Sequence, residues 1–189
     1  MSSGHYIALN GGERWYFDDP HGSAGNLQAR PLVEAAALIN RFTGHTNRIP
    51  FDLVTHSLHV VEVVKALAGN GHEIHTAAGH DLHEVFVGDV SRPLKLAMRE
   101  RSPEGRSPYD VLEADAAAAL AHRFDWQYPH PSIVKTADEM VLGWEADFVF
   151  GDGTARAWGL FPTDVPRPDT RATEMVVARL ANIIVGGRA

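Results

Sequence analysis

Apolar side chains recur along most of the chain at spacings of three and four residues, the period of an α-helix. The segment Ser132–Phe148 shows this spacing clearly, for example at Val134, Ala137 and Val141. Residues 52–68 are apolar around most of the helix circumference, which predicts a central helix with Asp52 as its N-cap. Further helices are expected over Leu32–Phe42, Glu73–Val87, Pro93–Met98, Tyr109–Arg123 and about Thr170–Val185.

Strand character is confined to the beginning of the chain. The run Arg14–Phe17 favours a strand, and Asp18–Gly22 is typical of a turn. A chain of 189 residues in this pattern predicts an all-α single domain. Its expected parts are a short β-hairpin within about 5–28, a helical core over about 31–149, and a C-terminal loop and helix over 150–189.

The composition is that of an ordinary globular protein, with 44% hydrophobic and 22% charged residues. The formal net charge of −7 disfavours a polymeric nucleic acid as partner, because such binding depends on Lys and Arg neutralising phosphates. A small anionic substrate stays possible, since a few cationic side chains and a metal ion at one site can outweigh the negative net charge of the whole chain.

The chain contains no cysteine, which excludes disulfides, thiolate metal sites and cysteine nucleophiles. Its N-terminus lacks the basic start and apolar run of a signal peptide. No stretch approaches the ~18 apolar residues of a membrane span. We therefore expect a cytoplasmic protein without a membrane partner.

The sharpest local feature is the pair His80-Asp81, followed by Glu84 and Asp89. On a helix, His80 and Asp81 would lie about 100° apart and could bind one ion from neighbouring directions. Imidazole and carboxylate ligands together suit Zn, Mn, Fe or Co. Glu84 would lie one turn further on, where a carboxylate can accept or donate the proton of a water beside the metal.

Two further residues supply the remaining ligand types. His56 lies among apolar residues of the 52–68 helix, and Asp138 lies at the edge of the apolar stripe of the Ser132–Phe148 helix. Taken singly, a histidine in that setting is more often a core residue, and such an aspartate is usually a surface residue. The order His, His-Asp, Asp along the chain makes the metal interpretation the stronger one.

This order resembles the HD superfamily of metal-dependent phosphohydrolases, and more closely its bacterial and prophage 5′-deoxynucleotidases. The resemblance runs from about Trp15 to about Trp144. Its signatures in this sequence are Asn40-Arg41-Phe42-Thr43-Gly44-His45, Thr55-His56-Ser57, His80-Asp81-x-x-Glu84-x-x-x-Gly88-Asp89 with Pro93-Leu94-Lys95, and Val134-Lys135-Thr136-Ala137-Asp138.

The resemblance implies a role for each matching residue. The metal ligands would be His56, His80, Asp81 and Asp138. The catalytic acidic residues near the scissile phosphate would be Glu84 and Asp89, and the substrate-binding residues would be Arg41, His45 and Lys95. The implied fold is an HD-domain helical bundle that is often a homodimer or a higher homo-oligomer.

The implied activity is hydrolysis of a deoxynucleotide phosphate ester with a divalent ion (Co, Mn, Zn or Fe), most directly a 5′-deoxynucleotidase releasing phosphate from dNMPs. Two alternatives stay open. A dNTP triphosphohydrolase of the phage dATP type would use the same four ligands and release triphosphate. A non-catalytic nucleotide-binding HD module is disfavoured by the presence of both Glu84 and Asp89.

Overall fold

The computed structural model describes residues 4–46, 51–160 and 174–186. In these residues the chain is mostly α-helical, with one two-stranded antiparallel sheet near its start. The all-α class with a short N-terminal hairpin is therefore confirmed. Residues 161–173, which include the end of the expected C-terminal loop and the first residues of the helix expected from about Thr170, lie outside the described residues.

The hairpin consists of β1 (Tyr6–Ala8) and β2 (Arg14–Tyr16), with Ile7 opposite Trp15. Trp15 is fully buried, and its ring stacks on Phe86 at 3.8 Å between centroids. Because an indole is the largest apolar side chain, this contact anchors the hairpin to the core.

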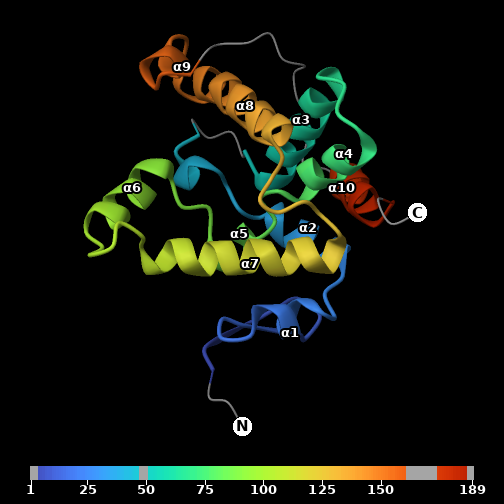
Figure 1. Cartoon of the computed structure of the whole chain (residues 1–189). Coiled ribbons are helices and arrows are strands. Elements are labelled where there is room, and N and C mark those ends of the chain that lie inside the picture. Colours follow the sequence, from blue (N-terminus) through green and yellow to red (C-terminus); the bar gives the residue numbers. More distant parts are fainter. Residues whose placement is uncertain (1–3, 47–50, 161–173, 187–189) are drawn as a thin grey trace.

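The turn expected at Asp18–Gly22 is only partly correct. The hairpin turn lies between β1 and β2, and the short helix α1 (Pro20–Ala24) begins within the expected segment. The carboxylate of Asp19 accepts a hydrogen bond from the backbone N–H of Gly22 and so caps this helix. Figure 1 shows α1 against α7 (Pro108–Phe124), on the side away from α3 (Leu53–Ala66) and α8 (Ser132–Phe150).

Helix α2 (Ala29–Ala36) ends well before Phe42, so the expected helix is too long. The chain instead runs alongside the start of α3. The Arg41 N–H donates to the carbonyl of Phe51 at 2.8 Å, and the Leu53 N–H donates to the carbonyl of Ile39 at 3.2 Å. These tertiary backbone bonds replace helical ones and bring Arg41 beside α3, just before the 3₁₀ turn η1 (Phe42–Gly44).

Helix α3 is central, as the apolar pattern predicts, and it contacts α4 (Gly71–Gly79), α8 and α10 (Glu174–Gly186). The carboxylate of Asp52 caps it by accepting from the Thr55 N–H at 2.9 Å. Eleven of its residues are buried, so polar side chains on this helix are held inside the protein.

The single helix expected over Glu73–Val87 is instead two helices. Helix α4 ends at Gly79, His80 to His83 form a turn, and α5 (Glu84–Val87) follows. The His80-Asp81 pair, predicted to bind a metal ion, therefore lies in an interhelical turn rather than within a helix. The remaining elements are α6 (Arg92–Glu100) and α9 (Thr154–Ala157).

Among the described helices, none combines the length and the apolar character needed to cross a bilayer. The core lies between α2, α3, α4, α7, α8 and α10, and α4 and α8 contact each other as well as α3. This meeting point contains the residues with candidate chemistry.

Candidate metal centre

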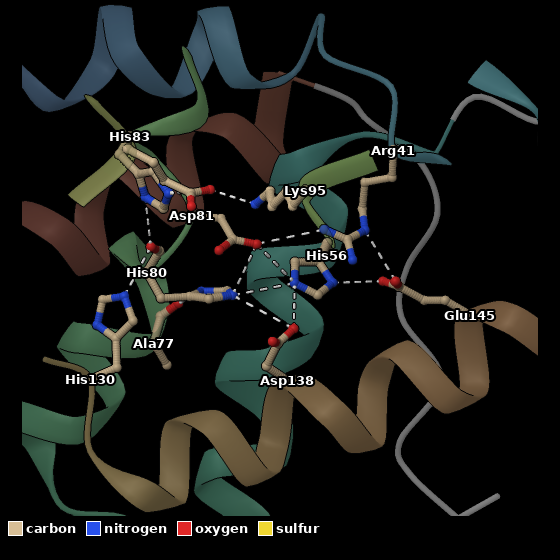
Figure 2. Close-up of polar contacts among 11 residues, drawn as sticks. Arg41, His56, Ala77, His80, Asp81, His83, Lys95, His130, Asp138 and Glu145 are labelled. Atoms are coloured by element: carbon tan, nitrogen blue, oxygen red, sulfur yellow. Dashed lines mark hydrogen bonds and ion pairs between the residues drawn. The ribbon is translucent and has the colours of Figure 1, made fainter. Parts of the chain in front are cut away.

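Three separate elements bring four predicted ligands to one place. His56 comes from α3 and is fully buried, His80 and Asp81 come from the turn after α4, and Asp138 comes from α8. Figure 2 shows all four side chains directed toward a common point. One ligand atom from each residue lies within 4.8 Å of the others.

The individual distances are short. His56 Nε2 lies 3.3 Å from His80 Nε2, 3.3 Å from Asp81 Oδ2 and 3.2 Å from Asp138 Oδ1. His80 Nε2 lies 3.2 Å from Asp81 Oδ2 and 4.0 Å from Asp138 Oδ1. Ligands around one ion at bonds of about 2.0–2.2 Å are separated by similar distances.

Hydrogen bonds on the far side of each imidazole decide which nitrogen faces the cluster. His80 Nδ1 lies 2.8 Å from the carbonyl of Ala77, and His56 Nδ1 lies 2.8 Å from Glu145 Oε1. Both partners are acceptors, so in each neutral ring Nδ1 carries the proton and Nε2 presents its lone pair. Two lone pairs and two carboxylate oxygens that face one another repel unless positive charge lies between them.

Glu145 is a residue that the sequence interpretation missed. It is fully buried on α8 and binds both His56 and Arg41, the latter at 3.1 Å from Nε to Oε2. A carboxylate behind a metal-binding histidine orients the ring and increases its basicity. The sequence feature that could have identified Glu145 is its position seven residues after Asp138. This spacing places both acids on the same helix face, next to the buried Val141.

Arg41 lies beside the cluster, as expected for a site residue, but its guanidinium is already engaged. It forms the ion pair with Glu145, and its Nη1 lies 3.6 Å from Asp81 Oδ2 (Figure 2). Its side chain is only 10% exposed. In this structure Arg41 therefore positions two acids of the site.

The electrostatics of the cluster favour a cation. Burial alone would raise the pKa of Asp81, but the neighbouring His80 and His56 hold it well below its usual range. Burial and Arg41 oppose the charged form of His56, yet Glu145, Asp138 and Asp81 raise its pKa well above the usual value. The acids thus create a negative potential at the point where the four ligand atoms meet.

The predicted catalytic acids lie next to this point in different settings. Glu84 is buried, and burial together with the charges of Asp81 and Asp89 raises its pKa well above the usual value. Asp89 is half-buried, and burial raises its pKa as well. A carboxyl group with a raised pKa is suited to exchanging protons near neutral pH.

A pocket of roughly 260 Å³ opens beside the cluster. Its wall includes two predicted site residues besides Asp81, namely Glu84 and Lys95, and it includes His83, Glu113 and His130, to which the sequence interpretation gave no firm role. His45 lies at the end of η1 with an exposed side chain, and the described contacts do not join it to the cluster. A substrate role for His45 stays a prediction.

The residues present fit a divalent metal ion. Two imidazole Nε2 atoms with fixed tautomers, two carboxylate oxygens and a carboxylate behind one ring form the mixed N/O set that suits Zn, Mn, Fe or Co. His56, His80, Asp81 and Asp138 could therefore hold a metal ion. No model of a known protein family matches the chain, and no curated protein matches it.

Proposed function

We propose that this chain is an HD-type metal-dependent phosphohydrolase that acts on deoxynucleotides, with deoxynucleoside 5′-monophosphates as its first substrates. The observation that supports it is the convergence of His56, His80, Asp81 and Asp138 within 4.8 Å, with Glu84 buried at the edge of the adjoining pocket. The substrate class is taken from the resemblance of the sequence signatures to those of 5′-deoxynucleotidases.

When bound, the ion would lower the pKa of a water and neutralise charge on the phosphoryl oxygens. The side chains of the chain perform the other tasks. Glu84 or Asp89 exchanges a proton with the attacking water or with the leaving oxygen. Lys95, on the pocket wall, supplies a cationic donor to the phosphate.

Arg41 fits this scheme chiefly as a positioning residue. Its ion pair with Glu145 fixes the acid that holds His56, and its second contact steadies Asp81. A phosphate oxygen that approaches the ion would compete with Asp81 for the outer guanidinium nitrogen, because guanidinium binds both groups as a planar fork.

The test is a screen of dNMPs, NMPs and dNTPs with the full chain, first stripped by a chelator and then reloaded with Co²⁺, Mn²⁺ or Zn²⁺. Phosphate and triphosphate are measured separately. We expect phosphate from dNMPs, no turnover without metal, and no turnover by Asp138→Ala. The exposed neighbour Glu139 provides the control variant Glu139→Gln, which should keep normal turnover.

Each other outcome points to a different function. Triphosphate from dNTPs with dNMPs untouched would replace the proposal by a triphosphohydrolase. Metal and nucleotide binding without any product would replace it by a non-catalytic binding module. Failure of the four-ligand site to bind any metal would refute both enzyme assignments.

A further inference from the structure

A second group of ligand atoms lies in the pocket beside the first site. His83, Glu84 and Glu113 each offer one atom, and these atoms lie within 4.8 Å of one another. The three residues come from three places in the fold: the turn after α4, the start of α5, and α7. Only the folded chain brings Glu113 to the other two.

His83 is prepared for metal binding in the same way as His80. Its Nδ1 lies 3.1 Å from the carbonyl of His80, so Nδ1 carries the proton in the neutral ring. Its Nε2 then presents a lone pair toward Glu113, whose Oε1 lies 3.7 Å away. A histidine fixed by a backbone carbonyl is the usual arrangement for a metal ligand.

Glu84 provides an independent observation that points to a ligand. Its side chain is only 5% exposed, and its Oε2 is buried with no hydrogen-bond partner among the described residues. Leaving a buried carboxylate oxygen unsatisfied is costly. A cation between Glu84, His83 and Glu113 would satisfy it.

Glu113 already binds one cation. Its Oε1 accepts a hydrogen bond from the ammonium of Lys95, and the hydroxyl of Tyr109 lies 3.4 Å from the same oxygen. The contact shows that this carboxylate attracts positive charge into the pocket. The ammonium would also compete with a metal ion, because two positive charges at one oxygen repel.

We propose that His83, Glu84 and Glu113 form a second binding site for a divalent transition-metal ion such as Mn²⁺, Co²⁺ or Zn²⁺. One imidazole and two carboxylates favour this class over Mg²⁺, which prefers oxygen ligands alone. Asp81 lines the same pocket, so the second ion would lie on the side of Asp81 that an anionic substrate enters. The site is defined by metal binding and does not depend on the proposed hydrolysis.

The experiment measures Co²⁺ bound to the full chain by equilibrium dialysis with elemental analysis, and follows the visible absorption of the bound ion. The wild type should bind one ion at each site. Asp138→Ala should lose the four-ligand site and keep the second, whereas Glu113→Gln and His83→Ala should do the reverse. The exposed Asp115 on α7 provides the matched control Asp115→Asn, which should bind both ions.

A Lys95→Met change distinguishes a metal site from a simple ion pair. In the Asp138→Ala background, removal of the ammonium should tighten Co²⁺ binding at least about tenfold, since a nearby positive charge disappears. If Glu113 serves only as the partner of Lys95, this change leaves Co²⁺ binding where it was, and the proposal is wrong.

Failure of this site and failure of the proposed function give different results. One ion in the wild type and none in Asp138→Ala would overturn the second site and leave the first intact. One ion that persists in Asp138→Ala but disappears in Glu113→Gln would support the second site and remove the first. Unfolding midpoints of all variants, measured alongside, separate loss of a ligand from loss of the fold.

Discussion

Glu145 Oε1 lies 2.8 Å from Nδ1 of His56, and both side chains are fully buried. This contact fixes the tautomer of His56, because a carboxylate accepts the Nδ1 proton and leaves Nε2 free for a metal ion. Glu145 also holds the Arg41 guanidinium. One carboxylate therefore connects a candidate metal ligand, His56, with the arginine beside it.

Glu145→Gln should weaken metal binding about 10- to 100-fold without removing a ligand, because the amide is a poorer acceptor for the Nδ1 proton. Competition with a metal-binding dye of known affinity measures the change. The exposed Glu139 on the same helix supplies the control, and Glu139→Gln should bind metal like the wild type. Unchanged affinity in Glu145→Gln would mean that the acid only supports the fold.

Glu84→Gln should lower turnover of the accepted nucleotide by about 10²- to 10⁴-fold, which is the range for loss of a general acid or base. The four-ligand site should still bind its ion, because Glu84 is not one of the four residues. Turnover rates and metal content are measured on Glu84→Gln and on Glu113→Gln, because Glu84 is also a ligand of the proposed second site and both variants would lose that ion. Loss of turnover in Glu84→Gln but not in Glu113→Gln assigns the proton transfer to Glu84. If Glu84→Gln turns over normally while Asp89→Asn does not, the proton carrier is Asp89.

Arg41→Ala should destabilise the fold by roughly 1–3 kcal/mol, because it removes one of the two partners of the buried Glu145 carboxylate and leaves only His56. The four-ligand site should still bind metal, since guanidinium is not a ligand. Denaturant unfolding with and without metal measures the loss. A raised KM with unchanged stability would instead show that Arg41 acts through the substrate alone.

Ser107→Ala should lower the free energy of unfolding by about 1 kcal/mol, because its hydroxyl and the carboxylate of Asp110 form a capping box at the start of α7. Thermal or urea unfolding checks this value. Helix α7 carries Glu113, so the cap also steadies one wall of the pocket.

The same cap predicts a pH dependence. The hydrogen bond from Arg99, aided by Ser107, holds the pKa of Asp110 below its usual range. A depressed folded-state pKa stabilises the protein above the unfolded value of about 3.9, and that stability is lost as the pH falls below it. Asp110→Asn should therefore be less stable than the wild type at pH 7, and the difference should shrink below about pH 4. A difference that stays constant across this range would contradict the assignment.

The sequence by itself determined the helical class and identified the four candidate metal ligands. The apolar period of α3 and α8 is long and regular, and local capping residues such as Asp52 mark where a helix begins. The ligands were identified by their order along the chain and not by any contact. Helix period and capping depend on residues close in sequence, and the order of the candidate ligands is a property of the linear chain, so both can be seen without a structure.

Only the tertiary structure decided where α2 and α4 end and which residues support the candidate ligands. Helix α2 ends at Ala36 because the following residues pair with the backbone at the start of α3, a contact that no local pattern encodes. The break after Gly79 puts His80 and Asp81 in a turn, where His130 reaches the carbonyl of His80. Glu145 and Glu113 gain their roles only through partners far along the chain, His56 and His83, because burial turns an ordinary helix carboxylate into a partner for a buried histidine.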